Sequence, residues 1–309
     1  MMKTILVTGG SGFIGRNIVE AFASDMNILA PSHAELDLLS SETVHRYFKE
    51  HDIDYVVHCA NIGGNRKNPG GWITLGKNIW MFSNISSNLS NVSRMIHLGS
   101  GAEYGKYRAL ENVHEREFGM AIPNDPYGLS KYVINESILK SDNIINLRLF
   151  GVYGKFEDYE YKFISNAIVR NLLGLPLNIR QNVVFDWLYI DDLIRVLRCF
   201  LNEKQCCWKS YNVTPGYRLD LVSIAVMINS LSRYQSRIYT NSQKMNNPYG
   251  GNNSRLRKTI GSDFKFTPIQ DAIRYLLEYY EEILPTIDRH EIERDVYADR
   301  CHTIGEGIP

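Results

Sequence analysis

The sequence lacks the features that mark several classes of protein. No run of apolar residues approaches the length that crosses a bilayer, and neither sign of charge forms a long block. The 34 basic and 34 acidic residues cancel. We therefore expect no membrane partner and no nucleic-acid partner, while a local anion site stays compatible with this charge balance.

Cysteine is also scarce. The five cysteines are odd in number and contain no C-x-x-C pair, so neither a disulfide framework nor a metal site is indicated. The chain enters a strand-like segment at Lys3, which leaves no room for a signal peptide. We expect a cytoplasmic protein with reduced, buried thiols.

What the sequence does contain is a regular alternation of apolar runs and helical patterns. The 309 residues, 44% of them hydrophobic, suffice for one large domain or two smaller ones. The expected strands of the first half are 4–10, 27–31, 55–60, 94–100 and 143–151. Continuous apolar strands separated by helices predict an α/β fold with a Rossmann-type doubly wound parallel sheet.

The pattern loosens beyond residue 152, and we expect three regions. These are a Rossmann domain (1–160, with 186–213 returning to it), a smaller α/β substrate-binding lobe (161–285) and a charged tail (286–309). The polar stretch 241–254 predicts a mobile loop. The helix after Pro268 carries a one-sided apolar stripe, which indicates core packing.

A glycine-rich turn, "TGGSGFIGR" (8–16), follows the first strand and opens the first helix. Gly9, Gly12 and Gly15 would permit a tight turn, a close approach to a pyrophosphate and close packing of helix on strand. The alternative is a merely tight turn, but the position between strand and helix favours a dinucleotide site.

The end of the second strand bears on the choice of cofactor. Sites for NAD usually carry an acidic residue there, whereas this chain has Ser32 and His33. Neither repels a 2′-phosphate, which favours NADP(H) over NAD(H), although His33 is equally typical of an exposed loop. We expect Asp37 and Leu38 near the adenine.

A tyrosine and a lysine share one helical face in "NDPYGLSKYVINE" (124–136). Tyr127 and Lys131 are four residues apart, directly after a proline that suits the first helical position. A tyrosine alone is a poor acid or base at neutral pH, and a neighbouring ammonium lowers its pKa. The pair becomes specific when it follows a strand that ends in Ser100.

These motifs together resemble the extended short-chain dehydrogenases/reductases of the sugar-nucleotide epimerase/dehydratase group. The resemblance runs from Lys3 to about Leu284 and is carried by "TGGSGFIG", "HCANIGG", "LGSGAEYG", "PYGLSKYVINE", "LRLFGVYG" and "FDWLYIDDL". It implies a nucleoside-diphosphate sugar as substrate, a homodimer, and a catalytic triad. In that triad Tyr127 exchanges a proton with the sugar oxygen, Ser100 hydrogen-bonds the same oxygen, and Lys131 holds the nicotinamide ribose.

The resemblance also implies further contacts. Those to the cofactor are Ser11, Phe13, Ile14, Ala60, Asn61, Ile62, Asn78, Phe150 and Val152. Those to the substrate are Ser100, Gly101, Ala102, Lys162, Asn166, Arg180, Arg218 and Arg255. Arg180 is the candidate diphosphate partner because a guanidinium binds two oxygens at once, although a surface arginine is an equal alternative. For Glu103 we expect an exposed loop carboxylate.

Two positions sort the reactions of this group. Members that dehydrate the sugar carry Asp-Glu where this chain has Gly101 and Ala102, and elimination needs both an acid and a base. Residues 35–64 and 98–105 are similar to GDP-fucose synthases, which epimerise with a cysteine and a histidine. The corresponding residues here are Ala102 and Lys162. We expect a 4-ketoreductase without C3/C5 epimerisation, in deoxysugar biosynthesis for surface polysaccharide.

Two alternatives stay open. An NAD-dependent C4 epimerase would use the same triad, but the missing acidic residue at the second strand disfavours it. A non-catalytic NADP-binding regulator on the same fold would not need the intact Tyr127 and Lys131.

Overall fold

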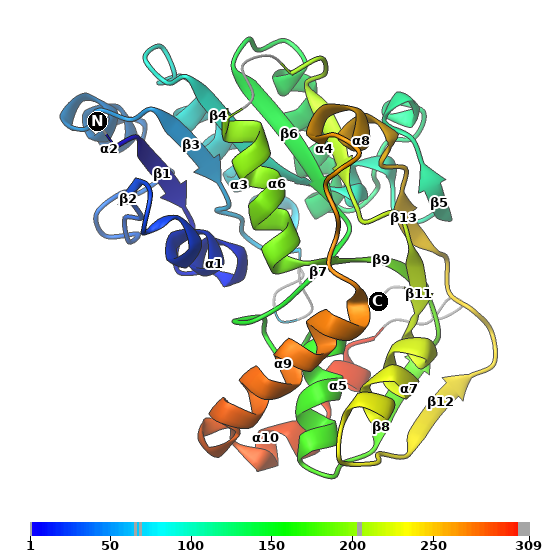
Figure 1. Cartoon of the computed structure of the whole chain (residues 1–309). Helices are drawn as coiled ribbons and strands as arrows, with labels where there is room; N and C mark the ends of the chain where they lie inside the picture. Colours follow the sequence, from blue (N-terminus) through cyan, green and yellow to red (C-terminus); the bar gives the residue numbers. More distant parts are fainter. Residues whose placement is uncertain (1, 65–66, 68–69, 203–205, 302–309) are drawn as a thin grey trace.

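Six parallel strands form the central sheet of the protein (Figure 1). The computed structural model describes residues 2–64, 67, 70–202 and 206–301. The sheet order is β10-β6-β4-β3-β1-β2, and every neighbouring pair is parallel. The strands are β1 (Thr4–Thr8), β2 (Asn27–Leu29), β3 (Tyr55–His58), β4 (Arg94–Ser100), β6 (Ile144–Leu149) and β10 (Ser210–Val213). The predicted Rossmann-like α/β fold is confirmed.

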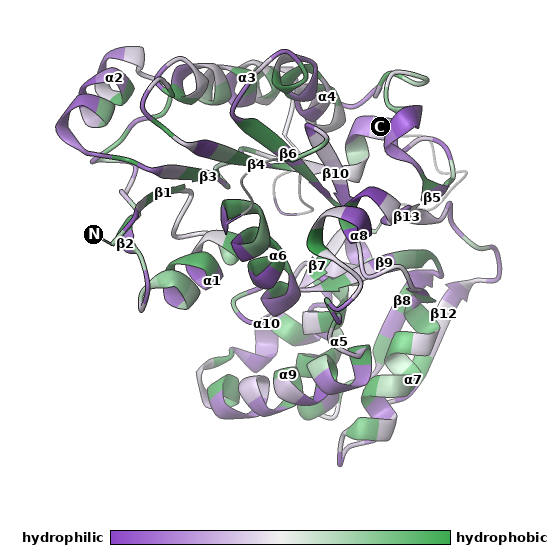
Figure 2. Cartoon of the chain, turned by 45° about the horizontal axis from the view of Figure 1, so that its top comes forward, coloured by the Kyte–Doolittle hydropathy of each residue, from purple (hydrophilic) through white to green (hydrophobic). Residues whose placement is uncertain are grey.

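Helices cover both faces of this sheet (Figure 2). On one face lie α1 (Phe13–Phe22) and α6 (Ile190–Asn202); on the other lie α2 (Ser41–Glu50), α3 (Trp72–Ser86) and α4 (Pro126–Ile138). The alternation of side chains along a strand explains the two layers. Ile5 and Val7 belong to the core on the α1 side, whereas Leu6 between them belongs to the core on the α3 side.

The order of the strands determines where a ligand can bind. The chain passes from β1 to β2 on one side and then crosses to β3 on the other side of β1. Parallel α/β sheets bind ligands at the carboxyl ends of the strands next to such a reversal. The glycine turn after β1, the segment after β3 and Ser100 at the end of β4 all lie at this edge.

A second lobe is built on smaller sheets. One has the order β11-β9-β13-β5 with β7 paired to β9, and β12 pairs with β8. The strands are β5 (Leu110–Val113), β7 (Gly151–Tyr153), β8 (Leu177–Gln181), β9 (Val184–Tyr189), β11 (Arg218–Asp220), β12 (Ile238–Ser242) and β13 (Tyr249–Gly251). The helices are α5 (Phe163–Leu172), α7 (Leu221–Leu231) and α9 (Ile269–Ile283), whereas α8 (Ser254–Ile260) packs on β10 and α6 of the central sheet.

The two lobes share one hydrophobic core. A continuous cluster of buried side chains includes Val7 of β1, Phe200 of α6, Ile168 of α5 and Ile273 of α9. The stripe predicted after Pro268 therefore packs inward from α9. Because this core is shared, the second lobe is held against the sheet by apolar packing as well as by the chain connections.

Residues 241–254, expected to be a mobile loop, include a strand. β13 lies between β9 and β5 and is parallel to both. The local sequence is dominated by Asn and Gly, so its strand character comes from the partners that the fold supplies.

The C-terminal segment docks on the second lobe through apolar side chains. Ile287, Ile292 and Tyr297 are buried, the last two in or beside the short helices α10 (Arg289–Glu293) and α11 (Val296–Asp299). Arg170 of α5 donates to the Ile292 carbonyl at 2.7 Å. Asp295 of this segment pairs with Arg170 at 3.3 Å, whereas most of its other charged side chains are exposed. Residues 302–309 lie outside the described part of the chain.

Over the residues that the structure describes, none of the helices combines the length and apolarity that a membrane crossing requires.

Candidate active site

The predicted triad comes together at the carboxyl edge of the central sheet. Ser100 is the last residue of β4, and Tyr127 and Lys131 lie on the first turns of α4. α4 starts where the sequence predicts, because Pro126 takes the first helical position and Asp125 caps the helix by accepting from Gly128 N–H at 2.8 Å. The cap determines where the helix begins and so aims the tyrosine at the end of β4.

Lys131 reaches into the protein from α4. Its side chain is buried, and Nζ donates to the Leu98 carbonyl at 2.9 Å and lies 5.9 Å from the centre of the Tyr127 ring. Burial lowers the pKa of this lysine to about 8, and the carboxylate of Glu103 opposes that change. The ammonium is therefore present at neutral pH, close to the Tyr127 phenol.

Tyr127 keeps its proton at neutral pH in the free protein. Burial raises the pKa of the phenol above its usual range, while a hydrogen bond with Ser100 lowers it. The ring is covered by the segment after β3, where Gly64 has φ +79°. A Cβ on Gly64 would lie 2.3 Å from Cδ2 of Tyr127, so only glycine lets the backbone come this close.

The glycine turn fits a dinucleotide. Gly9 has φ +69°, and a Cβ on Gly15 would lie 2.1 Å from the Gly9 carbonyl oxygen, so the turn and the helix are in contact. Gly12 precedes α1 and gives it no side-chain cap. An open helix N-terminus beside a backbone with no side chains in the way is the arrangement that binds a pyrophosphate. Ser11, Phe13 and Ile14 lie on the same turn.

The segment after β3 is held in place at the same carboxyl edge of the central sheet. Thr8 Oγ1 accepts from Ala60 N–H at 3.3 Å, which joins the ends of β1 and β3. Asn78 of α3 uses both ends of its amide on the backbone of Ile62, at 2.8 and 2.9 Å. Asn78 therefore positions this segment, while Asn61 is exposed beside it.

The residues expected around the adenine differ in exposure. Ser32 and His33 are exposed, Asp37 accepts from Leu39 N–H at 3.0 Å, and Leu38 is buried in the core. The structure adds a carboxylate that the sequence analysis did not assign here: Glu35 accepts from Ser32 N–H at 2.7 Å.

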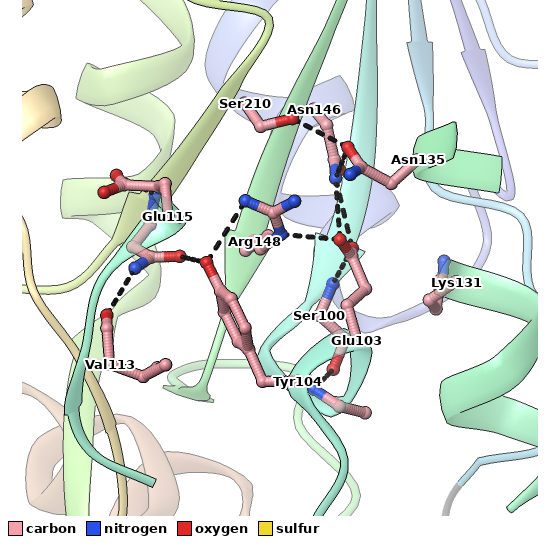
Figure 3. A network of polar contacts seen from close by, with 12 residues as sticks. Ser100, Glu103, Tyr104, Val113, Glu115, Lys131, Asn135, Asn146, Arg148 and Ser210 are labelled. Atoms are coloured by element: carbon pink, nitrogen blue, oxygen red, sulfur yellow. Dashed lines mark hydrogen bonds and ion pairs between the residues drawn. The ribbon is translucent and has the colours of Figure 1, made fainter. Parts of the chain in front are cut away.

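Glu103 does not lie on the surface, and the prediction of an exposed carboxylate is wrong. Its side chain is 0% exposed and forms a 2.5 Å ion pair with Nε of Arg148 on β6. The same carboxylate accepts from Asn146 at 3.1 Å and from Ser100 N–H at 3.1 Å. Figure 3 shows this carboxylate facing all three partners. It thus fixes the backbone of Ser100.

The network continues toward the second lobe. Arg148 donates to the hydroxyl of Tyr104, which donates to Asn212 of β10 at 2.8 Å. The Asn212 amide in turn donates to the Val113 carbonyl of β5 at 2.8 Å, and its backbone N–H donates to Glu115. The contacts in Figure 3 therefore join the central sheet to the second sheet directly behind Ser100.

The residues predicted to bind the substrate differ in the groups that they contact. Arg218 and Arg255 lie 3.9 and 3.8 Å from the carboxylates of Asp186 and Glu115. Asn166 is buried and donates to the Tyr159 carbonyl at 2.9 Å, so its amide serves the lobe itself.

Lys162 and Arg180 both lie in the second lobe. Lys162 is exposed and precedes α5, and Arg180 is half-buried on β8.

Gly101 and Ala102 open the short 3-10 helix η1 (Gly101–Tyr104) after Ser100. Ala102 is buried, and its N–H donates to Ser100 Oγ at 3.1 Å. Neither residue brings an ionisable group to the site. Among cofactor candidates, Phe150 faces Gly101, where a Cβ would come within 2.5 Å of its ring, and Val152 lies on β7.

Sequence reasoning did not assign roles to Arg148, Asn146 or Tyr249. A signal existed for the first two, because a charged and an amide side chain stand inside the apolar strand "NIINLRLFG" and buried polar groups require partners. Tyr249 had no such signal, since only the pairing of β13 brings it beside Ser100.

Replacing Glu103 by Gln tests the network. The variant leaves the Arg148 charge buried without a counter-ion, and breaking a buried pair in this way costs about 3–5 kcal/mol. We expect that loss in the free energy of unfolding measured by urea titration with circular dichroism. Glu111→Gln, an exposed residue of β5, is the matched control and should change stability by less than about 0.5 kcal/mol. Equal effects of the two variants would contradict the assignment.

Comparison with known proteins places these features in a family. The family model "NAD dependent epimerase/dehydratase family" matches residues 5–214. Over 304 residues, 89% of this chain and 97% of the relative, the chain is 24% identical to a GDP-L-colitose synthase of Yersinia pseudotuberculosis.

Two solved structures show the same fold. A GDP-mannoheptose C4 reductase from Campylobacter jejuni with NADP bound has a TM-score of 0.77 at 20% identity, covering 90% of this chain and 98% of that one. A UDP-glucose 4-epimerase of Thermotoga maritima has a TM-score of 0.77 at 18% identity, covering 91% and 99%. With the family model matching well over half of its length, the chain belongs to the NAD dependent epimerase/dehydratase family of nucleotide-sugar enzymes.

Proposed function

We propose that this protein reduces the 4-keto group of a nucleoside-diphosphate-linked 4-keto-6-deoxy sugar with NADPH, without epimerisation at C3 or C5. One observation carries the proposal: Ser100, Tyr127 and Lys131 converge, while the two residues after Ser100 are Gly101 and Ala102, which cannot exchange protons. The nucleoside would be guanosine, cytidine or thymidine. The GDP-sugar names of the similar proteins favour GDP.

The residues divide the chemistry among themselves. The bound nicotinamide would supply the hydride. Tyr127 is protonated at neutral pH and would give its proton to the carbonyl oxygen as that oxygen becomes a hydroxyl. The Ser100 hydroxyl would hold the same oxygen, and the Lys131 ammonium would stabilise the phenolate left on Tyr127.

The setting of the reaction is part of the proposal. We place it in deoxysugar biosynthesis for surface polysaccharide, in a cytoplasmic homodimer. Among the described residues no disulfide joins the cysteines, as is usual in a reducing compartment. Trp72, Ile73 and Trp80 of α3 are 60–77% exposed, and large apolar side chains gathered on one helix suit a subunit contact.

The assay for this function offers NADPH or NADH with GDP-, CDP- and dTDP-linked 4-keto-6-deoxyhexoses and follows cofactor oxidation and product stereochemistry by NMR. We expect a product inverted at neither C3 nor C5. Tyr127→Phe should lower kcat by about 100- to 10,000-fold, the contribution of a general acid, with cofactor affinity nearly unchanged. Tyr132→Phe on the same helix is the control. Interconversion of C4 epimers without net cofactor oxidation would support the epimerase instead.

The rate of reduction should depend on the charge of Lys131. Its pKa is lowered to about 8, so the ammonium is present below that pH and is lost above it. We expect kcat/KM for reduction to be level near pH 7 and to fall as the pH rises through about 8. Because Glu103 raises the pKa of Lys131, Glu103→Gln should move this fall to lower pH. A shift to higher pH would contradict the role given to Glu103.

Cofactor choice can be tested at Glu35. The absence of a carboxylate at Ser32 and His33 supports NADPH, whereas the Glu35 carboxylate on Ser32 N–H works against a 2′-phosphate there. Removing one surface charge is worth about 1 kcal/mol, so Glu35→Gln should favour NADPH over NADH by roughly fivefold more than wild type. Fluorescence titration of both cofactors measures the ratio, with Glu42→Gln as control. An unchanged ratio would place the 2′-phosphate elsewhere.

A further inference from the structure

A second phenol lies at the catalytic serine. The hydroxyl of Tyr249 is 3.4 Å from Ser100 Oγ. Tyr249 comes from β13 of the second sheet, whereas Ser100, Tyr127 and Lys131 come from the central sheet and its helix. The substrate lobe thus contributes a hydrogen-bonding group of its own to the place where the reacting oxygen would be held.

The position of this phenol is determined by its surroundings. The Tyr249 ring packs against Phe150 and Phe185, with ring centres 5.2 and 5.7 Å away. Two residues later, the N–H of Gly251 donates to the carboxylate of Asp186 at 2.6 Å, which anchors β13. A side chain held by packing on both sides and by a fixed strand is suited to orienting a ligand.

The loop after Ser100 makes room for the hydroxyl. A Cβ on Gly101 would lie 2.8 Å from the Tyr249 oxygen and 2.5 Å from the Phe150 ring. Any larger residue at position 101 would therefore have to displace Tyr249 or Phe150. Gly101 and Tyr249 form a complementary pair, one leaving the space that the other occupies.

The chemistry of Tyr249 differs from that of Tyr127. Burial raises the pKa of Tyr249 above its usual range, and the nearby Tyr127 and Glu103 raise it further, while the hydrogen bond with Ser100 acts in the opposite direction. Lys131 Nζ lies 5.9 Å from the centre of the Tyr127 ring, whereas the Tyr249 ring packs against Phe150 and Phe185. Tyr249 therefore stays a neutral hydroxyl that can donate and accept a hydrogen bond but cannot remove a proton from carbon.

We propose that the Tyr249 hydroxyl contacts the sugar at the substituent next to the carbon that is reduced, and so selects which sugars are accepted. This inference rests on the proposed reductase function. Ser100 would hold the reacting oxygen, and a rigid donor 3.4 Å from Ser100 Oγ faces the neighbouring oxygen of the same ring. A site built to bond a hydroxyl discriminates strongly against a sugar that lacks it, because its own polar group is then left unpaired.

The test compares Tyr249→Phe with wild type on two substrates, a 4-keto-6-deoxy sugar and its 4-keto-3,6-dideoxy counterpart, which lacks the neighbouring hydroxyl. The variant keeps the ring packing and loses only the oxygen. For the hydroxylated sugar we expect kcat/KM to fall roughly 10- to 100-fold, mostly through KM, as for one lost hydrogen bond to the substrate. For the dideoxy sugar it should change less than about threefold, so the preference of the wild type disappears.

The controls separate this role from others. NADPH affinity should be unchanged in Tyr249→Phe, and Tyr47→Phe on α2, whose ring stacks on His51 away from the site, should match wild type on both sugars. An equal loss on both sugars would indicate a structural role and overturn the inference, as would an unchanged preference. Wild-type protein that reduces neither sugar would contradict the reductase function itself, and this inference with it.

Discussion

The buried ion pair between Glu103 and Arg148 is the interaction on which the site depends. Taking both charges out of water is costly, and hydrogen bonds to neighbouring groups offset part of that cost. Here Asn146, Ser100 and Tyr104 add such hydrogen bonds to the pair. Removing one partner of the pair would leave the other charge buried alone. The contacts fix the backbone at Ser100, where the loop after β4 begins.

This network also explains how the two lobes are kept in register at the site. It runs from Ser100 through Arg148 and Tyr104 to Asn212, and from there to the backbone of β5. Behind it, one apolar core extends from the central sheet to the helices of the second lobe. Apolar packing alone tolerates small shifts, whereas hydrogen bonds to charged groups are directional. In the proposed reaction, the network would supply the precision that proton transfer between Tyr127 and a bound sugar requires.

Three hydroxyls lie close together here, those of Ser100, Tyr127 and Tyr249. Burial raises the pKa of both phenols, so both are neutral in the free protein; they differ in that Lys131 lies near Tyr127, while Tyr249 packs against aromatic rings. Ser100 lies between them and can bond to either or to a substrate oxygen. Gly101 and Ala102 bring no ionisable group to this place. Because they are small, they leave room for the Tyr249 hydroxyl and, in the proposed reaction, for the sugar.

Local sequence patterns by themselves determined the parallel sheet, the glycine turn and the start of α4, because strand period, turn residues and helix caps act over a few neighbouring residues. They also supplied Ser100, Tyr127 and Lys131 as candidates. The burial of Glu103, the strand at 249–251 and the placement of Tyr249 were decided only in the tertiary structure. Each depends on partners more than forty residues away: Arg148 for the carboxylate, and β9 and β5 for the strand. No periodicity within a short segment encodes such pairings, since their free energy exists only once distant chains meet.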